Sequence, residues 1–395
     1  MKKIKEYADI TSVFLNVTDA CNLACRYCFV TQQPTYMTLQ VAMDSVDFLV
    51  RNAQRKKESP SINFFGGEPL LCWDSIIVPL TDHIRSTCGD NFDLSLTTNG
   101  VLLTEEKLAY MKANQIGILL SIDGGKETQD YNRPCRNGQS SFDILSPLLP
   151  KVLENYPDVK FRSTVTPQSC DRLFENMMFA ASEGFRNYFV MPNEFEEWSE
   201  EANRTLESEF YKFVDYYIES FRNGSIPLQF STFEKCFKQI PQINHAIKTN
   251  EFRTLNQCNS CGKCGLGTSK FAAIDVEGNL YSCQEFSSNK LIRDVFYIGN
   301  IYDGVSSQMR NEIADTFDAT PFAGSNCESC KLNRICDGGC VANNYLVHKD
   351  VNRVTQVFCR WSQLLLEAAI HVMRTLGDEQ NELFREHLSG KAVLR

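Results

Sequence analysis

The chain has 395 residues, which is enough for one large domain and a smaller one. Its formal net charge is −9 and its basic run Arg55-Lys56-Lys57 is short, so nucleic acid and anionic membranes are disfavoured as partners. It carries 17 cysteines but no apolar run as long as a signal peptide or a membrane span, so we expect a cytoplasmic protein with reduced, metal-binding thiols.

A cysteine loop follows the first apolar stretch, residues 11–17, which is predicted to be a buried strand. Cys21, Cys25 and Cys28 lie within eight residues, and three close thiolates suit an iron–sulfur cluster. A cubane held by three cysteines leaves one iron open to an exogenous ligand. A structural zinc site is the alternative, but zinc normally takes a fourth ligand and no histidine is near in the sequence.

Apolar periodicity predicts six strands alternating with helices. After the first strand, the predicted strands are 62–65, 94–97, 118–122, 161–165 and 188–191. The predicted helices are 38–52, 73–85, 104–113, 142–154 and 170–182. This alternation indicates parallel βα units, so we predict an α/β fold built on a partial (βα)6 barrel, with ligand groups at the C-terminal ends of its strands.

Polar motifs follow three of these strands. Gly66-Gly67-Glu68-Pro69 follows the second strand, where glycines let the backbone approach a ligand and a carboxylate can bind an ammonium group. Thr98 and Asn99 end the third strand, and Ser121 and Asp123 end the fourth. Taken alone, each motif could be an ordinary strand-to-helix turn.

The next segment, residues 194–209, carries seven glutamates and is predicted to be a solvated face at the seam between two domains. Amphipathic helices are predicted around 210–221 and at 357–376, and the second is expected to pack as a closing helix. We predict a barrel domain at 1–235 and a cysteine-rich domain at 236–395.

Nine cysteines lie between residues 258 and 359. The spacing Cys327-x2-Cys330-x5-Cys336-x3-Cys340 is the most specific motif in the chain, although zinc knuckles also use C-x2-C pairs. The other five cysteines of this region are Cys258, Cys261, Cys264, Cys283 and Cys359. Buried, inert thiols are the default expectation at Cys72, Cys88, Cys135, Cys170 and Cys236, although Cys135 lies in a loop that could expose it.

The run Cys21-Asn-Leu-Ala-Cys25-Arg-Tyr27-Cys28-Phe29 resembles the signature of radical S-adenosylmethionine (SAM) enzymes. The resemblance implies that the open iron of a [4Fe–4S] cluster binds SAM, and that one electron splits SAM to give a 5′-deoxyadenosyl radical. It implies that Gly66, Gly67 and Glu68 hold the SAM amino group and that Tyr27 lies near the adenine. Arg133 would pair with the SAM carboxylate, with Arg136 as a rival. The ribose and the methionine moiety would contact Thr98, Asn99, Ser121 and Asp123.

The C-terminal cysteines resemble the SPASM extension of peptide- and protein-modifying radical SAM enzymes. The resemblance implies two auxiliary [4Fe–4S] clusters, which makes three clusters in all. One auxiliary cluster would take Cys264, Cys283, Cys340 and either Cys258 or Cys261. The other would take Cys327, Cys330, Cys336 and Cys359.

By this resemblance the substrate is a peptide or protein, and the electron comes from an external reductant of flavodoxin or ferredoxin type. We predict an oxidative modification, a thioether or carbon–carbon cross-link in a ribosomally synthesised peptide. The short stretch before the first strand leaves no room for an N-terminal leader-recognition domain, so leader binding is expected to use another surface or a separate protein.

The alternative is an anaerobic sulfatase-maturing enzyme, which oxidises Cys or Ser to formylglycine. That branch has a catalytic Asp after the cysteine that matches Cys283, where this chain has Gln284, so the alternative is weakened. Glu285 is one residue displaced and is a candidate base. A non-enzymatic iron–sulfur electron carrier is a third reading, but it leaves Gly66-Gly67-Glu68 unexplained.

Overall fold

The structure is a computed structural model that describes residues 10–249, 270–306, 308, 327, 330 and 338–390, with side chains to residue 240 in the first segment. One sheet runs through the described chain in the order β11-β10-β9-β8-β1-β2-β3-β4-β5-β6-β7. Its first six strands are parallel neighbours in chain order. They are β1 (Ser12–Thr18), β2 (Ser61–Gly66), β3 (Asp93–Thr98), β4 (Ile116–Ser121), β5 (Lys160–Val165) and β6 (Asn187–Pro192).

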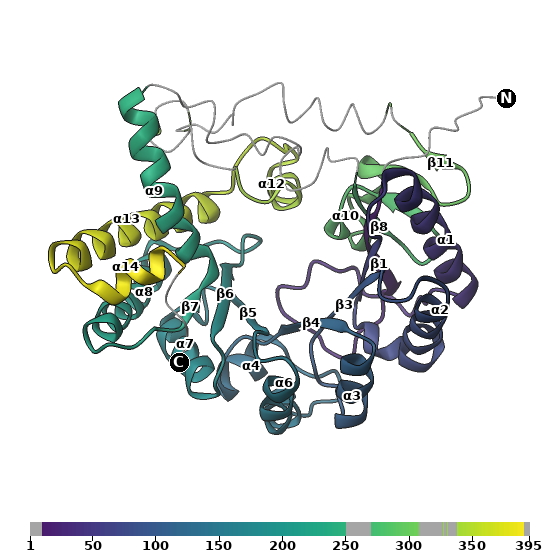
Figure 1. Ribbon diagram of the computed structural model, residues 1–395, viewed down its shortest axis with the longest axis horizontal. Coiled ribbons are helices and arrows are strands. Elements are labelled where there is room, and N and C mark those ends of the chain that lie inside the picture. The colour runs from purple at the N-terminus through teal and green to yellow at the C-terminus, as the bar shows by residue number, and fades with distance from the viewer. Residues whose placement is uncertain are drawn as a thin grey trace.

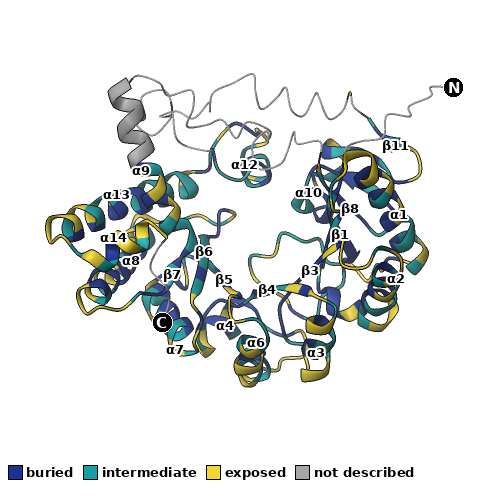
Figure 2. Ribbon diagram, in the orientation of Figure 1, coloured by how far each residue is buried: buried dark blue, intermediate teal, exposed yellow. Residues whose placement is uncertain are grey.

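Figure 1 shows this sheet as an open arch with helices along its outer side. The outer helices are α1 (Leu39–Lys56), α2 (Val78–Cys88), α3 (Glu105–Ala113), α4 (Lys126–Asn132), α5 (Ser141–Leu145), α6 (Leu149–Asn155) and α7 (Leu173–Ser182). Alternate strand residues, such as Leu15, Phe64 and Phe161, join the core beneath these helices. In Figure 2 the outer sides of α1, α3 and α6 are exposed, while most strand residues are buried or half-buried.

Two predicted helices are interrupted. The one predicted at 73–85 begins with a π-helical turn, Trp73–Ile77, before α2 starts, and it has Pro79 in its first α turn. The one predicted at 142–154 is divided into α5, a 3₁₀ turn at Ser146–Leu148 and α6. Pro147 and Pro150 lack the N–H groups that a continuous helix would use.

A helical layer packs on the β6 end of the sheet (Figure 1). It contains α8 (Glu200–Arg222), α9 (Ser231–Thr249), α13 (Gln356–Asp378) and α14 (Glu382–Leu388), next to the short strand β7 (Gln229–Phe230). An aromatic core holds it together, with the rings of Phe210 and Trp361 5.3 Å apart. Helix α8 starts ten residues before the predicted 210, because the hydroxyl of Ser199 accepts from the N–H of Ala202 and so caps its N-terminus.

The acidic segment is therefore only partly solvated. Glu194 and Glu209 are buried, so the prediction of a solvated face is wrong at both positions. The Glu209 carboxylate accepts from the N–H of Phe174 and pairs with Lys212, which offsets the cost of its burial.

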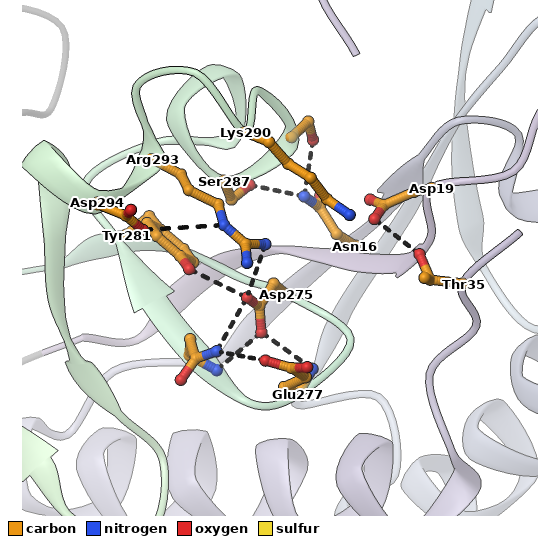
Figure 3. A network of polar contacts seen from close by, with 12 residues as sticks. Asn16, Asp19, Thr35, Asp275, Glu277, Tyr281, Ser287, Lys290, Arg293 and Asp294 are labelled. Atoms are coloured by element: carbon orange, nitrogen blue, oxygen red, sulfur yellow. Dashed lines mark hydrogen bonds and ion pairs between the residues drawn. The ribbon is translucent and has the colours of Figure 1, made fainter. Parts of the chain in front are cut away.

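The C-terminal segment extends the same sheet beyond β1. Its strands are β8 (Phe271–Ile274), β9 (Asn279–Tyr281), β10 (Tyr297–Asn300) and β11 (Gly304–Val305), with β8 parallel to β1 and the others antiparallel. The β8–β9 turn is organised by Asp275, whose Oδ1 accepts from the N–H groups of Glu277 and Asn279 (Figure 3). Gly278, at φ +85°, supplies the left-handed residue of this turn.

Two short helices, α10 (Gln284–Ser288) and α12 (Val341–His348), share a small apolar core that includes Phe286, Phe296 and Val341. The domain boundary at 235/236 stays a prediction. Within the described residues, no helix has both the length and the apolar character needed to cross a bilayer.

Candidate active site

The cysteine loop leaves the C-terminal end of β1 and packs on the end of β2. The N–H of Gly67 donates to the carbonyl of Thr18 at 2.8 Å, and that of Glu68 to the carbonyl of Ala20 at 2.9 Å. A Cβ atom on Gly67 would lie 2.2 Å from the Ala20 oxygen. The glycine therefore admits the backbone of the cysteine loop, whereas the sequence suggested close approach to a ligand.

Residues 132–136 hold the other side of the loop. The N–H of Ala24 donates to the carbonyl of Pro134, and Leu23 forms an isolated bridge with Cys135. This pairing buries Cys135, which agrees with the default expectation of a buried thiol and not with the exposure that its loop position also allowed. Arg136 lies on the outside, where its Nε donates to the carbonyl of Cys21 at 3.1 Å.

Polar N–H groups lie near two of the three thiols, those of Cys21 and Cys28. The N–H of Leu23 lies 3.4 Å from the Cys21 sulfur, and the side-chain amide of Asn99 lies 3.8 Å from the same atom. The amide of Gln32 lies 3.7 Å from the sulfur of Cys28. Such donors suit thiolates that ligate iron, because hydrogen bonds to the sulfurs stabilise their negative charge.

Without metal, burial raises the pKa of the Cys21 and Cys25 thiols to about 12. Iron would therefore have to displace their protons on binding. Within the described residues no three His, Cys, Asp or Glu side chains converge on one point that could hold a single metal ion.

Glu68 joins the ends of β2 and β3 from inside. It is fully buried, and its carboxylate accepts from the Thr98 hydroxyl at 2.7 Å, the Asn99 N–H at 2.8 Å and the Leu70 N–H at 3.0 Å. Burial raises the pKa of Glu68 to about 7 despite these donors. These contacts position Asn99 beside the Cys21 sulfur, and a direct contact of Glu68 with SAM stays a prediction.

Tyr27, Asp123 and Arg133 form a second group on the inner side of the loop. The Tyr27 hydroxyl donates to Asp123 at 2.6 Å, and the Nε of Arg133 lies 3.1 Å from the same carboxylate. The guanidinium carbon of Arg133 is 5.3 Å from the centre of the Tyr27 ring. The structure thus brings Arg133, and not Arg136, next to Tyr27. Ser121 is the last residue of β4, two residues before Asp123 in the chain, and it is half-buried.

The candidate base Glu285 lies in α10, which packs on β1. The side-chain amide of Asn16 donates to the hydroxyls of Ser287 and Ser288 at 2.6 and 2.8 Å (Figure 3). Burial raises the pKa of Glu285 to about 7, with a further upward contribution from the charge of Glu194. These groups place a titratable carboxylate on the same side of the sheet as the cysteine loop.

Comparison with known proteins identifies the core of the chain. Residues 15–202 match the family model described as the radical SAM superfamily. These residues form a radical SAM domain. Members of this superfamily are enzymes that use SAM and a [4Fe–4S] cluster, and the cysteine loop described above lies inside the matched region.

The chain is similar to two curated maturases over most of its length. It is 22% identical over 402 residues to the radical SAM cyclopropyl synthase TigE of Paramaledivibacter caminithermalis, covering 98% of this chain and 78% of the relative. It is 24% identical over 340 residues to the cysteine-type anaerobic sulfatase-maturating enzyme of Clostridium perfringens, covering 82% and 86%. The chain is thus a radical SAM enzyme related to maturases.

A solved structure described as native anSMEcpe with bound AdoMet and Cp18Cys peptide shares the fold, with a TM-score of 0.71 and 19% identity. The match covers 93% of this chain and 99% of that one. The prediction of an α/β radical SAM fold with a cysteine-rich C-terminal extension is confirmed.

The C-terminal cysteines of this radical SAM enzyme fall into two neighbourhoods. Cys283 and Cys340 both pack against the small apolar core of α10 and α12. The Cys359 thiol, on α13, has a pKa that burial raises, and the charges of Cys330 and Cys327 raise it further. The predicted ligands Cys258, Cys261, Cys264 and Cys336 lie outside the described residues. The assignment of these cysteines to two ligand sets stays a prediction.

Two side chains near the radical SAM site were missed from the sequence. Glu194 follows β6 and accepts from the Asn343 amide at 2.7 Å and from the Thr355 hydroxyl. Arg162 lies in β5 near Tyr27 and Asp123. The sequence did carry a signal for each of them. Glu194 is a carboxylate just beyond the end of a predicted strand, and Arg162 is a single charge inside an apolar strand.

Proposed function

We propose that the protein is a radical SAM maturase that removes a hydrogen atom from a peptide and leaves an oxidative modification. The observation that carries this proposal is the three-thiol loop, with Tyr27, Asp123 and Arg133 on its inner side. When bound, the cluster supplies the electron that splits SAM into methionine and the 5′-deoxyadenosyl radical. In this proposal Asp123 fixes the Arg133 guanidinium beside Tyr27, so that Arg133 can orient the SAM carboxylate.

The product we favour is a thioether or carbon–carbon cross-link in a ribosomally synthesised peptide. Support comes from the similarity to TigE, which is named for forming a new ring, and from a shared fold in which a peptide is bound beside AdoMet. Two auxiliary [4Fe–4S] clusters in residues 236–395 would take the second electron of the oxidation. An external one-electron reductant of flavodoxin or ferredoxin type would supply the first.

Formylglycine formation is the second candidate, and one observation favours it. Glu285 is half-buried two residues after Cys283, which gives the chain a carboxylate close to the place where the sulfatase-maturing branch has its base. In either reaction Glu285 would accept a proton from the substrate. The similarity to the Clostridium perfringens enzyme supports this candidate as much as the first.

The test is anaerobic reconstitution of the full chain with iron and sulfide, followed by addition of SAM and dithionite. We expect 5′-deoxyadenosine from the wild type and none from Cys25→Ala. Peptides encoded beside the gene are then added and followed by mass spectrometry. A cross-link removes two hydrogen atoms and keeps sulfur, whereas formylglycine formation from Cys removes sulfur. Absence of 5′-deoxyadenosine from fully loaded enzyme would refute both candidates.

A further inference from the structure

Arg162 lies on the inner face of the sheet. Its neighbour in β5, Phe161, packs on Phe179 of α7 at 6.2 Å between ring centres and therefore faces the outer helices. Because side chains alternate along a strand, Arg162 faces the opposite way. Its guanidinium carbon lies 5.2 Å from the ring centre of Phe189 on β6. The arginine thus faces away from the outer helices, on the side where the charges of Tyr27, Asp123 and Glu285 act on it.

The guanidinium of Arg162 is only partly used. Its Nη1 donates to the carbonyl of Ser163 at 2.8 Å and to the hydroxyl of Thr164 at 3.1 Å. The Nε and Nη2 groups make no hydrogen bond within the described residues, and no carboxylate there lies within ion-pair distance of Arg162. Arg162 is half-buried, so these unused N–H groups remain accessible to a ligand on the inner face of the sheet.

The nearby charges do not supply the missing anion. Asp123 is occupied by the Tyr27 hydroxyl, the Arg133 guanidinium and the N–H of Thr164, which lies 3.0 Å from its Oδ1. Burial lowers the pKa of Arg162, and the like charge of Arg133 lowers it further, with only partial compensation from Tyr27, Asp123 and Glu285. Arg133 and Arg162 therefore lie near the same carboxylate, that of Asp123, whose oxygens already accept from other groups.

We propose that Arg162 binds a carboxylate of a ligand on the inner face of the sheet, beside the Tyr27, Asp123 and Arg133 group. A planar guanidinium with two unused N–H directions matches a carboxylate in bidentate geometry. The carboxylate can come from SAM or from a peptide. We favour the peptide, since Arg162 also lies within the electrostatic range of Glu285 in α10. Resting on the proposed function, this makes the substrate a peptide with an acidic residue beside the modified one.

The experiment measures binding to cluster-loaded, unreduced enzyme, so no turnover is required. Wild type, Arg162→Gln and Arg162→Lys are compared by equilibrium dialysis, with Arg172→Gln as the matched control, because Arg172 pairs with Glu127 and Glu175 near the start of α7. The probes are SAM, decarboxylated SAM, and two end-blocked peptides, acetyl-Gly-Cys-Asp-Gly-amide and its Asn counterpart. Melting temperatures are recorded for every variant.

For a peptide carboxylate, Arg162→Gln weakens binding of the Asp peptide about 10- to 100-fold, with Arg162→Lys intermediate and the Asn peptide and SAM unaffected. For the SAM carboxylate, Arg162→Gln weakens SAM by the same factor and leaves decarboxylated SAM unchanged. The first result supports the proposal in full. The second supports a carboxylate site at Arg162 but overturns the acidic peptide. In both cases we expect a melting temperature close to that of the wild type, because Arg162 is half-buried and pairs with no carboxylate within the described residues.

Unchanged dissociation constants for both SAM and the Asp peptide in Arg162→Gln would overturn the proposal. A lower melting temperature would then show that Arg162 stabilises the fold and binds no ligand carboxylate. If Arg162→Gln does not fold, the Arg162→Lys data decide on the same criteria. Failure of the wild type to form 5′-deoxyadenosine would refute the proposed function alone, because these binding data do not depend on it.

Discussion

Glu68 is the side chain whose protonation the structure couples most directly to folding. Its pKa is raised by burial from the ordinary 4.5 to about 7, so between these values the folded state binds more protons here than the unfolded state. The contribution of Glu68 to the free energy of unfolding therefore falls as pH rises through this window, by about 3 kcal/mol in all. Urea unfolding of the metal-free protein at pH 5 and pH 8 measures it. Glu68→Gln should lose this part of the pH dependence. If the free energy of unfolding changes equally with pH in the wild type and in Glu68→Gln, the raised pKa does not belong to Glu68.

Tyr27 offers a second residue-level prediction. Tyr27→Phe removes the hydroxyl that donates to Asp123 at 2.6 Å and leaves a buried carboxylate with one donor fewer. We expect a loss of about 1–2 kcal/mol in the free energy of unfolding and weaker SAM binding, because Arg133 loses a fixed partner. The control is Tyr131→Phe, since Tyr131 is exposed and stacks only on Arg26. Equal effects of the two substitutions would show that the Tyr27 hydroxyl has no special role.

Individual site residues differed in how far the sequence could predict them. The cysteine loop could be recognised from its spacing along the chain, and its ligand role stays a prediction. Arg133 was distinguished from Arg136 only by the structure, since both stand in one loop and backbone pairing with residues 22–26 decides which side chain points inward. Glu194 was misread because its partners, Asn343 and Thr355, come from a segment about 150 residues away.

At the level of elements, the six parallel strands were predictable because each is buried on its helix side and carries a strong apolar pattern. The strands β7 to β11 were not predicted. They are two to four residues long, and such segments are stabilised by sheet neighbours and not by their own sequence. The interruption of the helix predicted at 142–154 could have been predicted from Pro147 and Pro150, whose effect is local.

The contact between β2 and the cysteine loop gives the element-scale prediction. Gly67→Ala would place a Cβ atom 2.2 Å from the Ala20 carbonyl oxygen, and backbone on both sides cannot yield without moving the loop. We expect a loss of about 1–3 kcal/mol in stability and reduced iron retention at the first cluster. Gly125→Ala is the matched control, because a Cβ atom there meets nothing within 4 Å. Iron content and thermal unfolding check both variants, and a Gly67→Ala protein that keeps its iron would refute the packing argument.

For the whole molecule, the end of β6 is tied to the helices that carry two predicted cluster ligands. Glu194 accepts from Asn343 in α12 and from Thr355, which caps α13, and these helices begin at or near Cys340 and Cys359. Glu194→Gln keeps the size but exchanges one acceptor oxygen for a donor. We expect it to loosen α12 and α13 while leaving SAM cleavage with dithionite intact. Hydrogen exchange in residues 338–360 would show this, and unchanged protection there would contradict it.

Cluster stoichiometry tests the organisation of the full chain. Three [4Fe–4S] clusters require about twelve iron atoms per protein, and loss of one cluster removes about four. Cys25→Ala and Cys359→Ala should each retain about eight, because Cys25 lies in the loop after β1 and Cys359 lies on α13, with separate surroundings. They should differ in function: the first abolishes 5′-deoxyadenosine formation, while the second keeps it and loses peptide modification. Cys88→Ala, at a thiol given no ligand role, should retain all twelve. A wild-type content of eight iron atoms would indicate a single auxiliary cluster. A full iron content in Cys359→Ala would show that Cys359 is not a cluster ligand.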